Sequence, residues 1–407
     1  MNNQSTPLQN IISILTIFMF ASFFLFETYT WGRFILLGVS VLILLLSAIE
    51  NHGKIMLAIH PWHYFILAIA LFSLTSSLWA VSSADAIQKF ITTMQILVCL
   101  SFLYSYYGQE DNIYRLINII KWAGYCVAIY AFVFYGKDFI LQMLRTSRRL
   151  ENGFSNVNSI GLLSSFSIII EIYEIRYQKK VKISALLMIP SFMMVLATQS
   201  RKAFVLLVLG IFLVLLVSSN ERKNIIQKAA SFCGLIVLFG IAGFFLLKLP
   251  VFSGINERFL YLLETARGQG EAGSSAVLRS QMFAIGWKYF CKSPIVGIGY
   301  GCPHVIAARE MHFDAYLHNN YIELLAGGGI VGFSLYYSMY IYLFKKIYNY
   351  RNVAHYGKAI CLIMLFLFLV MDFGMVNCYS KEMYFYFMIF FLLIEQLRNG
   401  QDILANQ

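Results

Sequence analysis

Apolar runs of about twenty residues, with few charges inside them, recur along almost the whole chain from residue 11 onward. Each run is long enough for a helix to cross the hydrocarbon core of a bilayer. The charged fraction is 13%, whereas a soluble domain carries about 25% charged residues. The alternating strands of a membrane barrel do not occur. The sequence therefore predicts an all-α protein, built as a polytopic transmembrane helix bundle.

About twelve spans can be placed along the chain. They cover residues 11–29, 34–49, 61–80, 86–107, 115–135, 157–174, 181–199, 203–218, 229–248, 320–344, 358–376 and 382–397. We expect residues 1–407 to form a single integral membrane domain, with spans 1–9 in 11–248, one long loop in 249–319 and spans 10–12 in 320–397. The uncharged start has no small-residue cleavage site, so the first span is expected to stay as an anchor.

Lys and Arg in the short loops predict the orientation. The loops after spans 6, 8 and 10 are basic and would lie on one side: they hold Arg176, Lys179, Lys180, Lys182, Arg222, Lys223, Lys228, Lys345, Lys346, Arg351 and Lys358. That side is expected to be cytoplasmic, which turns the long loop outward. The outward loops nevertheless carry basic residues, among them Arg148, Arg201, Lys202 and Arg279. An anionic ligand at the outer membrane face would explain them.

The net charge of +11 does not indicate a nucleic-acid partner, because no polar segment has a dense basic run with interleaved aromatic residues. The seven cysteines include no CxxC pair. Cys291 and Cys302 lie in or near the long loop, where a bridge is one interpretation and two unpaired thiols the favoured one.

The stretch from His318 to Gly332 places an imidazole and two amides at the start of an apolar helix. Histidine has the side-chain pKa nearest neutrality, so at a membrane boundary it can accept or give a proton. A plain helix start with a capping Asn, followed by glycines that allow close helix packing, fits the same residues. Arg201 and Arg279 offer planar guanidinium donors suited to phosphate oxygens. Their alternatives are an interfacial anchor and a solvated loop residue.

Three histidines near the end of the long loop suggest a metal site at first sight. His304, His312 and His318 are spaced by eight and six residues, which matches no compact metal-ligand motif. The sequence therefore predicts no metal and no other cofactor.

Three carboxylates lie within or near apolar runs. Asp372 falls inside predicted span 11, and a carboxylate buried in a membrane often serves proton-coupled transport. A transporter, such as a flippase for lipid-linked oligosaccharides, is thus the alternative from another functional class. Glu171 and Glu174 lie near the inner end of predicted span 6, and we expect them to reach the cytoplasmic interface.

Four pieces of sequence occur in a characteristic order: residues 153–158 (GFSNVN), residues 198–203 (TQSRKA), Arg279 followed by Trp287 and PxxGxG at 294–299, and His318-Asn319 followed by Gly329 and Gly332. Together they resemble the bacterial O-antigen ligase superfamily, which also takes in many Wzy-type polysaccharide polymerases. The resemblance covers residues 150–345. It implies a helical membrane bundle similar to that of GT-C glycosyltransferases.

The resemblance also implies a reaction. Members take a glycan from an undecaprenyl-diphosphate carrier at the outer face of the inner or sole bacterial membrane and transfer it to an acceptor hydroxyl. His318 would accept the proton of that hydroxyl, while Arg201 and Arg279 would stabilise the leaving diphosphate. The expected substrate-binding residues, which orient the imidazole, stack on sugars or bind the donor, are Lys202, Asn319, Tyr321, Glu323, Trp287, Tyr300 and Arg148.

Lys202 after Ser-Arg, with the His-Asn-Asn-Tyr-Ile-Glu form of the motif, is more similar to repeat-unit polymerases than to ligases. The acceptor would then be another lipid-linked repeat unit of a surface polysaccharide (O-antigen, capsule or exopolysaccharide). In a ligase it would be lipid A-core. The implied partners are these lipid-linked glycans, membrane lipids, a flippase and a chain-length regulator.

Overall fold

The computed structural model describes residues 6–26, 32–50, 52, 59–108, 113–146, 150, 156–219, 225–248, 256, 260, 274–352 and 356–405. These residues form fifteen α-helices, one 3₁₀ helix and no strand. The helices are α1 (Pro7–Leu25), α2 (Gly32–Glu50), α3 (Pro61–Ser76), α4 (Ser83–Tyr107), α5 (Ile113–Tyr135), α6 (Lys137–Thr146), α7 (Val157–Gln178), η1 (Ile183–Leu187), α8 (Met188–Ala197), α9 (Arg201–Ser219), α10 (Ile225–Leu247), α12 (Ser274–Lys292), α13 (Pro303–Met311), α14 (Asn320–Asn349), α15 (Tyr356–Met371) and α16 (Lys381–Ala405).

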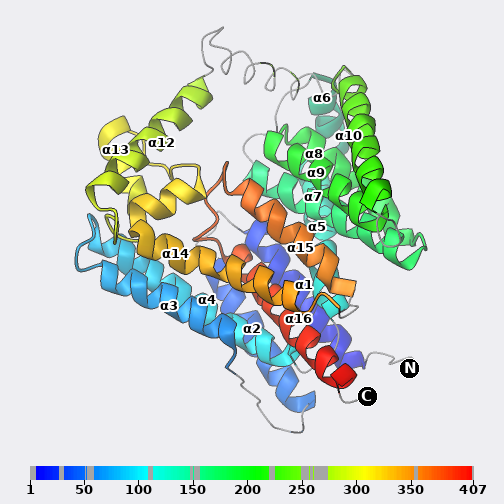
Figure 1. Cartoon of the computed structure of the whole chain (residues 1–407), viewed down its shortest axis with the longest axis horizontal. Coiled ribbons are helices and arrows are strands. Elements are labelled where there is room, and N and C mark those ends of the chain that lie inside the picture. Colours follow the sequence, from blue (N-terminus) through cyan, green and yellow to red (C-terminus); the bar gives the residue numbers. More distant parts are fainter. Residues whose placement is uncertain are drawn as a thin grey trace.

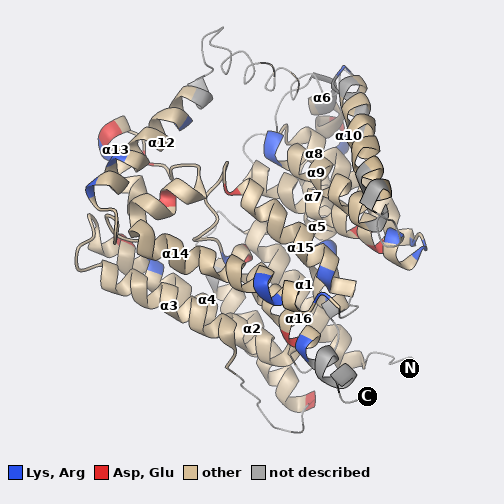
Figure 2. Cartoon of the chain, viewed as in Figure 1, with Lys and Arg blue, Asp and Glu red and all other residues tan. Residues whose placement is uncertain are grey.

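The all-helical prediction is confirmed for the described residues, and a helix overlaps each of the predicted spans. Among those residues, five helices are long and apolar enough to cross a bilayer: α1, α4, α5, α7 and α14. Four shorter apolar helices, in 34–50, 61–76, 183–197 and 356–371, accompany them. The protein is therefore a membrane protein, while the number of crossings stays a prediction. Figure 2 shows Lys, Arg, Asp and Glu mostly toward the ends of the helices.

Helix α7 is deeply enclosed in the bundle. It packs against α5, α8 and α9, and its residues from Ile160 to Ile170 are all buried. A helix that is apolar all round is expected to be surrounded by other helices. The second packing centre is α14, which lies against α3, α12 and α16 (Figure 1).

The described part of the predicted long loop folds into α12 and α13, at one end of α14 (Figure 1). A small apolar cluster joins them to the start of α14; its members are Met282, Ala307, Leu317, Ile322 and Ala326. Cys291 is exposed and Cys302 is buried, and both are free thiols in this structure. Most of residues 249–273 lie outside the described residues.

Helix α14 is broken at Gly329, whose backbone angles are φ +60° and ψ −162°. The break interrupts the helical hydrogen bonds, and the 294–299 loop replaces them. Four backbone hydrogen bonds do this, two in each direction: Ile298 N to Ala326 O (3.0 Å), Gly299 N to Gly327 O (3.0 Å), Ile330 N to Pro294 O (2.8 Å) and Val331 N to Ile295 O (3.0 Å). Since buried backbone groups without a hydrogen-bond partner are costly, the loop and the broken helix form one structural unit.

Glycines make this close backbone contact possible. A Cβ at Gly329 would lie 2.4 Å from Ile295 O, and one at Gly297 would lie 2.4 Å from Gly327 O. Both residues also have positive φ, a conformation that favours glycine. The glycines of the two motifs are therefore explained by the meeting of two backbones.

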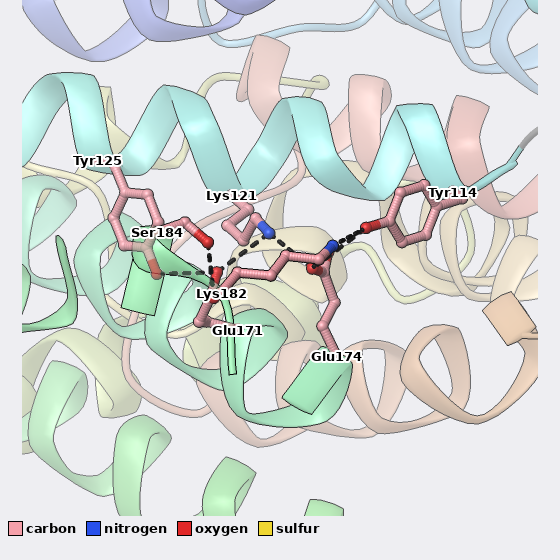
Figure 3. Close-up of polar contacts among 7 residues, drawn as sticks. All are labelled: Tyr114, Lys121, Tyr125, Glu171, Glu174, Lys182 and Ser184. Atoms are coloured by element: carbon pink, nitrogen blue, oxygen red, sulfur yellow. Dashed lines mark hydrogen bonds and ion pairs between the residues drawn. The ribbon is translucent and has the colours of Figure 1, made fainter. Parts of the chain in front are cut away.

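A group of buried charges lies toward the C-terminal end of α7 and is drawn in Figure 3. Lys121 Nζ lies 3.0 Å from Glu171 Oε2 and 2.7 Å from Glu174 Oε2, and all three side chains are at most 2% exposed. Four further side chains donate hydrogen bonds to these carboxylates: Tyr114, Tyr125, Lys182 and Ser184. We call these seven residues the Lys121 cluster. The expectation that Glu171 and Glu174 reach the interface was wrong, because α5 and η1 cover them.

Candidate active site

Asn319 caps the start of α14. Its side-chain oxygen accepts a hydrogen bond from Ile322 N at 3.0 Å, which satisfies one of the amides that a helix start leaves unpaired. Its side-chain nitrogen donates to Phe373 O at 3.3 Å, in the connection between α15 and α16. The Asn319 amide therefore fixes the helix start to that connection.

His318 directly precedes the cap and has φ +55°. This left-handed backbone costs a non-glycine residue on the order of 1–3 kcal/mol. Both neighbours hold it: Leu317 N donates to Glu323 Oε2 at 2.9 Å, and Asn319 is bound as the cap. The His318 side chain itself is exposed. The backbone is thus fixed while the imidazole stays accessible.

The surroundings of His318 lower the pKa of its imidazole, which favours the neutral form. Desolvation by the neighbouring protein atoms is the largest cause that lowers the pKa of His318, and the positive charges of Lys202 and Arg279 lower it further. Burial also lowers the pKa of the Arg279 guanidinium, which remains charged. The structure therefore brings His318 together with two cations from separate helices, α9 and α12.

The turn before α9 packs against α7, and this contact positions Lys202 at the start of α9. A Cβ at Gly161 of α7 would lie 2.8 Å from Thr198 Oγ1, so the two segments touch. Ser200 is buried and its Oγ accepts from Ala203 N at 3.5 Å. Arg201 is the first residue of α9, beside Lys202. On the other side of Lys202, a Cβ at position 374 would lie 3.3 Å from its Cε.

Arg279 owes its place to the packing of α12 on α14. Met282, three residues after Arg279, lies in the apolar cluster with Leu317. Residues three apart share one face of a helix, so Arg279 lies on the face of α12 that Met282 turns toward α14. A Cβ at Gly286, one turn further, would lie 2.7 Å from Ile322.

Behind His318 and Asn319 lies a buried network made by the next residue, Asn320, and by Asp372. Asn320 Nδ2 donates to Asp372 Oδ2 at 3.2 Å, and Asn320 N donates to Asp372 O at 2.8 Å. Tyr337 OH donates to Asp372 Oδ2 at 2.9 Å and Asn377 Nδ2 to Oδ1 at 2.7 Å. We call these four residues the Asp372 network. Asp372 was expected inside a span, but it follows the end of α15 and binds the start of α14.

Two predicted binding residues have structural contacts. Tyr321 OH donates to Leu369 O at 2.8 Å, and its ring stacks on Tyr337 with centroids 5.1 Å apart. Glu323 is fully buried and binds Leu317 N rather than the His318 imidazole. It therefore holds the backbone next to His318.

The remaining predicted residues have different surroundings. Trp287 on α12 is half exposed, so one face can meet a ligand. Tyr300 is 1% exposed, with its ring against Phe72 and Tyr379, and a ring so enclosed has no face to offer a sugar. Arg148 lies outside the described residues.

No three His, Cys, Asp or Glu side chains in the described ranges are grouped so that they hold a metal ion. His304 contacts two aspartates, Asp85 and Asp314, and is separate from His318. Independence of metal ions stays a prediction.

The comparison with protein families gives one match. Residues 185–337 match the family model for O-antigen ligase. This region is similar to O-antigen ligases, and we call it the O-antigen ligase domain. The match confirms the resemblance within 185–337, a narrower range than expected, and residues 153–158 lie before it. A search of curated proteins found no match.

The O-antigen ligase domain contains Arg201, Lys202, Arg279 and His318. The family includes ligases and polymerases that transfer lipid-linked glycans. Asp372 follows the matched range, yet it binds Asn320 within it. The sequence signal for this contact was the group of polar residues at 372, 377 and 380 in an otherwise apolar region, but nothing in it names the partner.

Proposed function

We propose that this protein is a polysaccharide polymerase of the bacterial inner membrane, with its active site on the extracytoplasmic side. It takes an oligosaccharide from an undecaprenyl-diphosphate carrier and transfers it to a second lipid-linked repeat unit. The observation that carries the proposal is the meeting of His318, Lys202 and Arg279 within the O-antigen ligase domain. A neutral base beside two cations suits a hydroxyl acceptor and a diphosphate leaving group.

In the proposed step, a hydroxyl oxygen of the acceptor sugar attacks the anomeric carbon of the donor sugar. The bond from that carbon to the phosphate oxygen breaks, and the diphosphate leaves with the bonding electrons. His318 accepts the hydroxyl proton. A lowered pKa keeps most of the His318 imidazole neutral at pH 7, so it is ready as a general base.

The leaving diphosphate gains negative charge as the bond breaks. Fixed cations in a partly desolvated site stabilise that charge more strongly than they would in water. Lys202 and Arg279 fill this role, and Arg201 supplies a planar fork for a second oxygen at the start of α9. Trp287 offers an exposed ring to a sugar.

A ligase is the second candidate, because the matched family is described as O-antigen ligase. Its chemistry at His318 would be the same, and only the acceptor differs. Two sequence features favour a polymerase: Lys202 after Ser-Arg, and the His-Asn-Asn-Tyr-Ile-Glu form of the motif. A transporter is less well supported, since Asp372, its main argument, is engaged by three side-chain donors next to the site.

The purified full-length protein in nanodiscs tests the proposal. It is incubated with undecaprenyl-diphosphate-linked saccharide from the host, with and without lipid A-core. A ladder of lipid-linked products without lipid A-core supports a polymerase, and a conjugate formed only with lipid A-core supports a ligase. If neither product forms while the saccharide crosses the bilayer of proteoliposomes, the protein is a transporter.

The proposed side of the membrane is tested separately. Single cysteines replace Arg279 and Trp287 in an otherwise cysteine-free chain, and intact cells are treated with an impermeant thiol reagent. We expect both positions to react. Labelling only after the cells are opened would refute the extracytoplasmic site.

A further inference from the structure

A second group of polar side chains lies beside the segment that leads into His318. Its members come from α4, α13 and residues 312–319, and we call it the Tyr316 cluster: Asp85, Lys89, His304, Asp314 and Tyr316. None of these residues has a role in the proposed step. Their contacts and exposure nevertheless suit a ligand with hydroxyl groups.

One imidazole draws two carboxylates together. His304 Nδ1 lies 2.9 Å from Asp314 Oδ1, and His304 Nε2 lies 3.5 Å from Asp85 Oδ2. The Asp314 side chain is 73% exposed and that of Asp85 is 36% exposed. Both therefore keep oxygens that can accept hydrogen bonds from outside the protein.

Tyr316 supplies an accessible ring next to these carboxylates. Lys89 Nζ donates to Tyr316 OH at 3.1 Å and lies 4.4 Å from the centre of the Tyr379 ring. The aliphatic part of Lys89 crosses Gly301, where a Cβ would lie 2.5 Å from its Cγ. Tyr316 is 42% exposed. The ring is thus held in place while a large part of it faces outward.

The Tyr316 cluster is close to His318 along a fixed backbone. Only Leu317 separates Tyr316 from His318, and Leu317 N is bound to the buried Glu323. The Cα atoms of Tyr316 and His318, two positions apart, are separated by at most about 7 Å. A sugar that lies on Tyr316 is therefore within reach of the His318 imidazole.

The charges around this segment are divided. Lys202 and Arg279 are the charges that act on His318, whereas the two carboxylates of the Tyr316 cluster lie on the α4 and α13 side. A diphosphate is attracted by the first group and repelled by the second. Sugar hydroxyls and the apolar face of a pyranose ring suit carboxylates and an exposed tyrosine.

We propose that the Tyr316 cluster binds the terminal sugar of the acceptor glycan, and that this sugar is a neutral or amino pyranose rather than a uronic acid. The proposal rests on the proposed function, because it assigns the second substrate of that same site. Its carboxylates accept the sugar hydroxyls, and Tyr316 stacks on the ring. His318 then meets the hydroxyl that reacts.

The test uses the full-length protein in nanodiscs with two probes. The donor is the host's undecaprenyl-diphosphate-linked saccharide, and the acceptor is the same saccharide released from its carrier by mild acid. We expect Asp314→Asn and Tyr316→Ala to raise the KM for the released saccharide about tenfold, with kcat within about twofold. Tyr316→Phe, which keeps the ring, should retain most of the affinity.

The matched control is Glu310→Gln. Glu310 also forms an exposed ion pair, with Lys288 Nζ at 2.7 Å, and accepts a hydrogen bond from Tyr289. Glu310 lies on α13 but outside the Tyr316 cluster. The KM of Glu310→Gln for the released saccharide should therefore equal that of the unaltered protein. Binding of undecaprenyl diphosphate should be unchanged in all four variants, which shows that each is folded.

Direct binding separates this inference from the proposed function. Saturation-transfer NMR detects contact between the released saccharide and the protein without any donor. If the unaltered protein binds the saccharide and Tyr316→Ala does not, the inference holds even where turnover is absent and the proposed function fails. Equal binding or equal KM in all variants, or no binding by the unaltered protein, would overturn the inference.

Discussion

The Asp372 network and the Lys121 cluster are both buried polar groups, and they lie toward opposite ends of the helix bundle. In the Asp372 network one carboxylate is surrounded by amide and phenol donors. In the Lys121 cluster two carboxylates enclose an ammonium group. The first lies behind the exposed His318, whereas the three charged groups at the centre of the second are at most 2% exposed.

This difference separates function from architecture. The Lys121 cluster matches its charges internally, with Lys182 as the second cation beside Glu174, so it joins helices without need of a ligand. The two charges that lower the pKa of His318, those of Lys202 and Arg279, are both positive. In the proposed step these cations would face the leaving diphosphate.

The largest expected effect concerns the Lys121 cluster. Lys121→Ala leaves Glu171 buried without its ammonium partner and Glu174 with Lys182 alone, and it should lower the free energy of unfolding by about 3–5 kcal/mol. The measurement is chemical unfolding of the purified protein in detergent. As a control, Lys121→Met combined with Glu171→Gln and Glu174→Gln should recover most of the loss. If Lys121→Ala is as stable as the unaltered protein, or if it folds but loses turnover, the Lys121 cluster is not a purely structural group.

The next effect concerns His318. His318→Ala should lower the transfer rate by about a hundredfold or more while the stability and the binding of the lipid-linked donor stay the same. Single-turnover transfer and thermal unfolding are measured side by side. His318→Gln keeps a hydrogen-bonding group without the base. Near-normal turnover by that variant would end the general-base role, though not the assignment to the O-antigen ligase domain.

A smaller effect is expected for Arg201→Lys. The substitution keeps the charge but replaces the planar fork with a point charge, so the rate should fall about tenfold, mainly in kcat rather than in donor affinity. Steady-state kinetics with the lipid-linked donor distinguish the two. A lysine variant with the original kcat would make Arg201 an interfacial anchor.

The smallest effect is a shift in pH dependence. The positive charge of Lys202 lowers the pKa of His318, and activity requires the neutral imidazole. Transfer should therefore fall as the pH drops through this lowered pKa, below its ordinary value of about 6.5. Lys202→Gln removes the charge, raises the pKa of His318 and should move the acid limb to higher pH. The control, Lys288→Gln on α12, should leave the limb unchanged; equal limbs in Lys202→Gln would contradict the pairing.

Hydropathy and motif spacing predicted most of the helices and the region that matches the family. The helices in every predicted span and the O-antigen ligase domain with His318, Arg201 and Arg279 follow from residues close together in sequence. The Glu171 and Glu174 interpretation failed because hydropathy averages over a segment. It cannot tell whether a charge near a helix end meets solvent or an ammonium group on another helix.

The sequence by itself determined that the chain is a helical membrane protein and which motif holds its imidazole. Apolar length and local motifs suffice for that, because they report on one segment at a time. Only the tertiary structure decided that Lys202 acts on His318, that the 294–299 loop completes the broken α14, and that Asp372 binds Asn320, 52 positions away. Such contacts depend on how helices pack, since each partner gains its hydrogen bonds only when the other is brought beside it.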